Sequence, residues 1–265
     1  MRVPILENRL RCSMALFGAC CGVFCASAAS AESVGGVSGG GVTIAPYRID
    51  GTPLLDSFYL RYNDSDHHVE SLRVEPRPLT DSLFVSLADV NGDDDYYYSV
   101  EHRDSLDTGI TANFVSGFCR GSCLLPLTPP PNSVFVLTGF SFQFTNGDHH
   151  LDRIGIVREG NSVRTYFDDE NDDDEYVVTV GYAWIPAIRA TPSRVSGTAT
   201  GATQVPMTNG PNTVISGFFF NYDDPDHHLR EIGVLTGTTD LQLFYADRNA
   251  DDSFTYTVDL TLLTL

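Results

Sequence analysis

The stretch FYLRYNDSDHHVE at residues 58–70 recurs with substitutions as FSFQFTNGDHHLD at 140–152 and as FFFNYDDPDHHLR at 218–230. Three coincident Asp-His-His triplets are not expected by chance in a chain that holds only seven His. On both sides of each triplet, apolar side chains alternate with polar ones, which is typical of half-buried antiparallel strands. The chain therefore contains three copies of a unit of roughly 80 residues.

A second motif, Asp-x-Asn-x-Asp-Asp, follows each triplet and also lies between two alternating segments. It occurs at 89–94, 169–174 and 247–252. The segment between the two motifs has the length and composition of a hairpin turn, as at 158–162 and 236–240. Each unit is thus predicted to be a four-stranded antiparallel meander. In a meander the first and third turns lie at the same end of the sheet, so both polar motifs are expected there.

The predicted organisation is a cleaved signal peptide followed by three all-β repeats, each an antiparallel meander or sandwich. Residues 1–31 combine a basic start, an apolar run and a small-residue cleavage site, as secretory signals do. The other expected segments are a flexible lead-in that also accommodates a first strand (32–53), repeats at 54–102, 135–183 and 214–265, a connector with both remaining Cys (103–134) and a Pro/Thr/Gly/Ser-rich connector (184–213). The connectors also contain short apolar alternations, which predict one or two further strands per unit. Because the connectors have linker composition, we expect small sandwiches in a row, with one pseudo-threefold body as the alternative.

The charge of the chain is strongly acidic. Beyond residue 31 there are 13 Arg and no Lys against 34 acidic residues, a formal charge of −21. Such a surface repels nucleic acid and attracts cations. A second apolar stretch of membrane-spanning length is not found after the signal. We therefore expect an exported protein, secreted, periplasmic or at the cell surface, without a membrane span in the mature chain and without a nucleic-acid partner.

The acidic motif has oxygen donors at its positions 1, 3, 5 and 6, and calcium takes six to eight oxygen ligands. Carboxylates held this close repel one another unless a cation neutralises them. Over about six residues per unit the motif resembles the start of an EF-hand calcium loop, but position 6 is Asp rather than Gly and position 12 is Val rather than Glu. The missing ligand is expected from the Asp of each triplet; the alternative is an ordinary polar turn. The predicted metal ligands are Asp89, Asn91, Asp93, Asp94, Asp169, Asn171, Asp173, Asp174, Asp247, Asn249, Asp251, Asp252, Asp66, Asp148 and Asp226.

The His pairs of the triplets are the other candidate ligands. They are His67, His68, His149, His150, His227 and His228. Adjacent residues on a strand point to opposite faces, so at most one imidazole of each pair is expected to face the acidic loop. Imidazole with carboxylates suits Zn²⁺ or another transition metal better than Ca²⁺. The alternative is that one His packs at the end of the sheet while its neighbour is solvated.

Four of the six Cys lie in the predicted signal, and Cys119 and Cys123 remain. Two Cys in an oxidising compartment are expected to form one local disulfide.

The sequence lacks the nucleophile, zinc-protease and phosphate-binding motifs of common enzymes. Three near-equal sites also favour binding over catalysis. We expect an exported repeat protein that binds divalent cations, chiefly calcium, at three equivalent loops. It would act as a binding, adhesion or matrix module, with a glycan or a cell-surface ligand as a further partner. The alternatives are an acidic scaffold without metal, a metal-dependent hydrolase and a calcium-dependent lectin.

Overall fold

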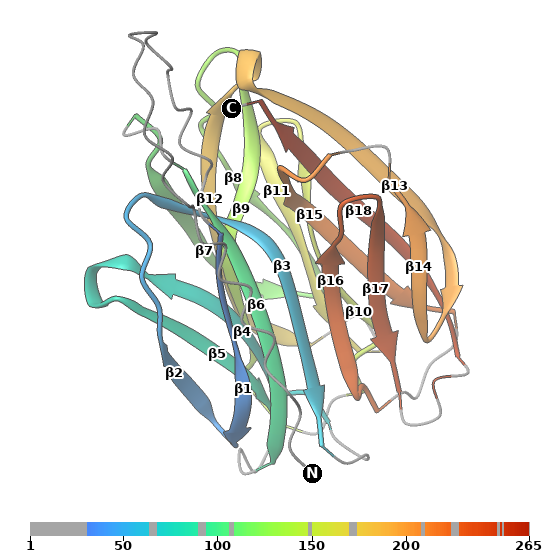
Figure 1. The fold of residues 1–265 in the computed structure, drawn as a ribbon. Helices are drawn as coiled ribbons and strands as arrows, with labels where there is room; N and C mark the ends of the chain where they lie inside the picture. The colour runs from blue at the N-terminus through green and yellow to red at the C-terminus, as the bar shows by residue number, and fades with distance from the viewer. Residues whose placement is uncertain are drawn as a thin grey trace, which may run out of the picture.

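The computed structural model describes residues 31–63, 68–89, 94–105, 109–147, 150–169, 174–207, 210–223, 228–247, 250 and 252–264 (Figure 1). Within these ranges the chain forms three antiparallel six-stranded sheets and two short 3₁₀ turns, η1 (Pro78–Thr80) and η2 (Ala187–Arg189). The all-β fold class predicted from the alternating segments is confirmed. The predicted signal peptide, apart from Ala31, lies outside the described residues.

Each of the three units contributes six strands. Unit 1 holds β1 (Ala31–Gly39), β2 (Val42–Pro46), β3 (Thr52–Tyr62), β4 (Ser71–Arg77), β5 (Ser82–Ala88) and β6 (Asp95–Ser105). Unit 2 holds β7 (Ala112–Arg120), β8 (Ser122–Pro126), β9 (Ser133–Phe144), β10 (Arg153–Glu159), β11 (Ser162–Asp168) and β12 (Glu175–Pro186). Unit 3 holds β13 (Ala190–Thr200), β14 (Ala202–Pro206), β15 (Thr213–Tyr222), β16 (Glu231–Thr236), β17 (Asp240–Ala246) and β18 (Ser253–Leu263).

Every sheet combines half of one unit with half of another. Sheet A has the order β1-β6-β3-β16-β17-β14, sheet B β2-β5-β4-β9-β12-β7 and sheet C β13-β18-β15-β10-β11-β8. The first, sixth and third strands of a unit thus lie in one sheet, and its fourth, fifth and second strands complete the sheet of a neighbouring unit. One pairing rule repeated three times closes the units into a ring around a pseudo-threefold axis.

Two predictions about this arrangement are therefore wrong. The four strands around the polar motifs do not form a meander, because β3 pairs with β6 and β4 pairs with β5, while the triplet turn leads from sheet A to sheet B. The units are also not sandwiches in a row. Each half-unit buries its apolar face by joining the sheet of a neighbour, and an alternating pattern is the same whichever neighbour supplies the partner strand.

The lead-in and both connectors consist largely of paired strands. Residues 32–53, expected to be flexible with one strand, contain β1 and β2, which turn sharply at Gly40 (φ 88°) and Gly41 (φ 62°). The corresponding hairpins turn at Gly121 and Gly201, which also have positive φ. Glycine adopts this backbone conformation without the steric strain that a Cβ causes. The connectors thus supply two strands each, within the predicted range.

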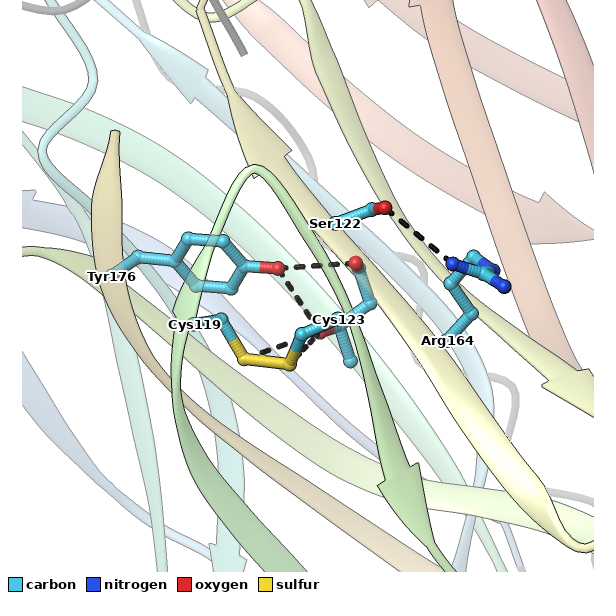
Figure 2. The surroundings of a disulfide bond; sticks show 6 residues. Cys119, Ser122, Cys123, Arg164 and Tyr176 are labelled. Atoms are coloured by element: carbon cyan, nitrogen blue, oxygen red, sulfur yellow. Dashed lines mark hydrogen bonds between the residues drawn. A yellow bond between two sulfur atoms is a disulfide. The ribbon is translucent and has the colours of Figure 1, made fainter. Parts of the chain in front are cut away.

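The predicted disulfide between Cys119 and Cys123 is confirmed, and it links β7 to β8 across the turn at Gly121. Figure 2 shows the disulfide beside the ring of Tyr176, with Ser122 and Arg164 hydrogen-bonded to each other further along the hairpin. Cys119 is the register partner of Tyr176 on β12, and Cys123 is that of Thr165 on β11. Tyr176 donates its hydroxyl hydrogen to the backbone oxygen of Thr165, 3.0 Å away, and so links these two strands directly. The disulfide therefore closes a corner between sheets B and C.

The core is centred on three phenylalanines, one from each unit. Phe58, Phe140 and Phe218 are buried, and their ring centroids are 5.1, 5.1 and 5.2 Å apart. Such aromatic pairs contribute about 0.5–1.5 kcal/mol each beyond their buried area. Because β3, β9 and β15 carry these rings at equivalent positions, the axis runs between these three strands.

The seam between units 1 and 3 lies in sheet A, where β3 pairs with β16. Arg103 donates hydrogen bonds to Asp56 in its own unit (2.6 Å) and to the backbone oxygen of Pro211 in unit 3 (2.8 Å). Thr236 of unit 3 donates to the same carboxylate. Burial raises the pKa of Asp56, and the hydrogen bond from Thr236 and the charge of Arg103 oppose that rise. A buried ion pair within unit 1 is thus hydrogen-bonded to unit 3 through both of its members, which joins the first and last units of the chain.

Candidate metal centre

The two polar motifs of each unit begin and end beside one another. In each unit the residue that follows β3, β9 or β15 donates its backbone N–H to the backbone oxygen of the residue after the acidic motif. The three hydrogen bonds are 3.0–3.1 Å long and join Asn63 to Asp95, Thr145 to Glu175 and Asp223 to Ser253. The residue that precedes the next strand donates to the last residue before the acidic motif, over 2.8–3.1 Å; these pairs are Glu70–Ala88, Asp152–Asp168 and Arg230–Ala246. Both motifs therefore cross between sheets at the same end of the ring.

A second set of backbone hydrogen bonds joins each triplet turn to the adjacent unit. Tyr62 donates to the carbonyl of Arg230 (2.9 Å), Phe144 to that of Glu70 (2.9 Å) and Tyr222 to that of Asp152 (3.1 Å). The accepting residue is always two positions after the second His of a triplet. The residue between them is fully buried in the core; these residues are Val69, Leu151 and Leu229. The backbone on the C-terminal side of each of these His is therefore fixed by burial and by a bond to another unit.

The second His of each triplet consequently lies on the axis. The ring centroids of His68, His150 and His228 are 4.4, 4.6 and 4.5 Å apart. The Nε2 atoms of His68 and His150 are 3.0 Å apart. One potential ligand atom from each of the three rings lies within 4.8 Å of the others, and all three residues are half-buried. Three units thus contribute one imidazole each to a single point.

This geometry suits a metal ion with nitrogen ligands. Two nitrogens bound to one tetrahedral zinc lie about 3.3 Å apart, given Zn–N bonds of about 2.0–2.1 Å. The spread of ligand atoms in the triad therefore needs only small side-chain adjustments to reach coordination distance. A neutral imidazole has one N–H donor and one lone-pair acceptor, so two such rings can form a hydrogen bond with each other. Three lone pairs that point to one place are best satisfied by a bound cation.

The outcome for the predicted ligands differs between the two motifs. His68, His150 and His228 come together, whereas the preceding His67, His149 and His227 lie outside the described residues. Outside them as well are Asp66, Asp148, Asp226, Asn91, Asp93, Asn171, Asp173, Asn249 and Asp251. The structure describes Asp89, Asp94, Asp169, Asp174, Asp247 and Asp252, which flank the acidic loops.

In units 1 and 3 the described carboxylates act on the tyrosine that ends β3 or β15. The pKa of Tyr62 is raised well above its ordinary value by burial first and then by the charges of Asp89 and Asp94. The pKa of Tyr222 is raised in the same way, by burial and then by Asp247 and Asp252. Equivalent carboxylates thus act on equivalent side chains in units 1 and 3. The negative field around the end of the axis favours a bound cation.

The convergence of the three His was not predicted, although each was a candidate ligand. The signal for it was present, because the same position of every triplet carries His. A closed threefold ring brings equivalent positions to one axis, whereas sandwiches in a row keep them apart. The expected arrangement of sandwiches in a row therefore predicted three separate sites instead of one shared site.

No protein-family model matches the chain, and a search of curated proteins gives no match. A solved structure of Sulfolobus turreted icosahedral virus aligns over 84% of this chain and 83% of its own at 8% identity, with a TM-score of 0.20. A similarity this low carries no weight for fold or function. Among the described residues, no helix has the length and apolar character needed to cross a membrane.

Proposed function

We propose that this β protein is exported and binds one divalent transition-metal ion, of the zinc type, through His68, His150 and His228. The observation that supports this is the approach of one ligand atom from each unit to within 4.8 Å of the other two. A neutral set of three nitrogens favours Zn²⁺, Cu²⁺ or Ni²⁺ over Ca²⁺ and Mg²⁺, which prefer oxygen. The donor chemistry therefore selects the metal class.

The proposed role of the ion is to cross-link the three units at one end of the ring. The ligands come from equivalent positions of the three units, so one ion would hold all three units together. A ligand that binds only the folded state stabilises it by about 4 kcal/mol at a free concentration of 1,000 Kd. Three protein ligands also leave one coordination position for water or an external group.

Calcium binding by the acidic loops remains a second proposal. In all three units the same backbone hydrogen bonds hold the ends of the loop, and described carboxylates flank it at equivalent positions. Oxygen donors would thus be repeated at three places around the axis, as a calcium-dependent adhesion or matrix module requires. The two proposals differ in metal and in stoichiometry, with one zinc-type ion against three calcium ions per chain.

Metal counting combined with thermal unfolding tests both proposals. The purified protein is stripped with a chelator, then given Zn²⁺ or Ca²⁺, and bound metal is measured by elemental analysis. We expect close to one zinc per chain and a zinc-dependent rise in Tm. His150→Ala should abolish both, while His149→Ala, the neighbouring His in the same triplet, should retain them.

Each alternative result has a distinct meaning. About three calcium ions with a calcium-only rise in Tm would replace the first proposal by the second. Bound zinc that survives His150→Ala would place the metal elsewhere. Absence of bound metal and of any shift would reject both.

A further inference from the structure

The outer faces of the three sheets differ at one equivalent position of the ring. It consists of two paired residues. One follows the inward-facing Val100, Val180 or Val258 on the sixth strand of its unit, and the other is its partner on the neighbouring edge strand. On sheet C the pair is Arg194 and Asp259, which form a forked ion pair over 2.6 and 2.9 Å. On sheet A the pair is Ser33 and Glu101. On sheet B it is Phe114 and Gly181, so only here is the acidic side chain missing.

A groove of about 360 Å³ lies at this place on sheet B. Its floor includes Gly139 of β9 and Gly181 of β12, which are partners across the two strands. Phe114 of the edge strand β7 lines it and is 78% exposed. An aromatic side chain this exposed has most of its face available to a ligand.

Gly181 of β12 keeps the floor of the groove free of a side chain. A Cβ added at Gly181 would first meet the side-chain oxygen of Thr138 at 2.7 Å, and the nearest backbone atom would be 3.3 Å away. The equivalent positions carry Glu101 and Asp259, so sheets A and C accept a large side chain here, whereas on sheet B the buried hydroxyl of Thr138 would have to move. Sheet C has a groove of similar volume at the equivalent place, about 360 Å³, but Arg194 and Asp259 line it. Sheet B therefore differs by its exposed aromatic side chain and its uncharged floor, not by the space itself.

Polar groups surround this space without adding net charge. On the β4 side Arg77 and Glu75 form an ion pair of 2.6 Å, and Arg77 is half-exposed. On the other side the hydroxyls of Ser116 and Thr179 are hydrogen-bonded over 2.9 Å. These groups offer both donors and acceptors, and the Arg and Glu charges cancel.

We propose that the sheet B groove binds a ring of a neutral saccharide. One face of a sugar ring is made of C–H groups and packs on an aromatic side chain, while its hydroxyls need donors and acceptors at the edge of the site. The groove volume lies near the lower limit of small-molecule sites, roughly 300–1,000 Å³. The chain carries a net charge of −19 and the groove has no surplus cation, so anionic sugars are disfavoured. This site is independent of the proposed metal centre.

The three sheets supply the test variant themselves. Phe114→Arg combined with Gly181→Asp transfers the ion pair of sheet C to sheet B and replaces the aromatic lining of the groove by two charged side chains. Phe114→Ser introduces the residue that sheet A carries at this position, Ser33, and is the second test variant if the double variant does not fold. Phe118→Ser is the matched control, because Phe118 is 63% exposed on the same face of β7 but does not line the groove.

Binding is measured by saturation-transfer NMR and titration calorimetry with maltotriose, cellotriose, mannotriose and triacetylchitotriose at millimolar concentration. We expect at least one to bind, at least a tenfold loss in both Phe114 variants, and no loss in Phe118→Ser. Unchanged Tm values verify folding. Three results would overturn the proposal: no binding by any of the four sugars, binding undiminished in a folded Phe114 variant, or stronger binding of a uronic-acid trisaccharide.

Discussion

The three units use the same residues along the axis and different residues at the corner hairpins. On the axis, Phe58, Phe140 and Phe218 meet in the core, and three His meet at one end. At the corners, the equivalent positions hold Ser38 hydrogen-bonded to Thr43 in unit 1, the disulfide of Cys119 with Cys123 in unit 2, and Ala199 with Thr203 in unit 3.

This difference has a geometric reason. Side chains on the axis contact their own counterparts, so a change in one unit affects all three at the same point. Side chains at a corner contact only local neighbours, so each unit can use its own chemistry there. A repeated residue in this sequence therefore marks the axis more reliably than it marks a binding loop.

Truncating one ring of the axial Phe cluster should give the largest loss. Phe140→Ala leaves a cavity in the core, where such a change typically removes 3–5 kcal/mol from the free energy of unfolding. Phe118→Ala, at an exposed position, should change it by no more than about 0.5 kcal/mol. Denaturant unfolding of both variants checks the contrast. Equal losses would mean that the axis has no special role in stability.

The His triad should respond to zinc symmetrically. His68→Ala, His150→Ala and His228→Ala should each remove the zinc-dependent stabilisation, about 4 kcal/mol at 1,000 Kd of free zinc. In chelator-treated protein the three variants should resemble one another. The measurement is the zinc-dependent change in Tm for each variant. Loss in one variant only would show that the three units do not share the ion.

A single buried His away from the axis should make stability depend on pH. His102 has Tyr182 and Leu260 as its equivalents, and burial lowers its pKa to about 4, although the hydrogen bond with the Thr138 carbonyl (3.0 Å) acts in the opposite direction. In the unfolded chain this His binds a proton near pH 6.5, so its contribution to stability is present above 6.5 and is lost as the pH falls to about 4.

The loss over this interval should be about 3 kcal/mol, from a difference of about 2.5 pKa units. His102→Leu, which introduces the unit 3 residue, should lack this part of the pH dependence. Unfolding free energies of both proteins at pH 7, 5.5 and 4 provide the test. Parallel curves for the two proteins would show that His102 does not titrate as described.

The corner disulfide should have the smallest effect of the four. The closed loop is short, and loop entropy then gives at most about 2 kcal/mol. Cys119→Ser with Cys123→Thr replaces the disulfide by the hydrogen-bonded pair of unit 1, so the loss should be smaller still. Comparing Tm for this variant with that of the parent chain measures it. A loss as large as that of Phe140→Ala would contradict the separation of axis and corners.

The sequence was sufficient to predict the strands, because alternating side chains directly reflect which face of a strand is buried. It also predicted the disulfide, since Cys119 and Cys123 are close in the chain and no other Cys follows the predicted signal. It did not reveal the sharing of sheets, because the alternation in β4 is satisfied equally by β3 and by β9. The meeting of His68 with His150 and His228 depends on that sharing and could not be derived without it.

The pairing of β3 with β16 also constrains the order in which the chain can fold. The hydroxyl of Tyr59 donates to Glu231, 172 residues later, over 2.8 Å, and β3 remains an open edge until that segment has been synthesised. Contacts this distant in sequence slow folding, and an unpaired strand edge promotes aggregation meanwhile. The first unit is therefore a late-maturing part of the molecule, and a nascent chain that stops before residue 231 carries an incomplete sheet whatever the quality of its local sequence.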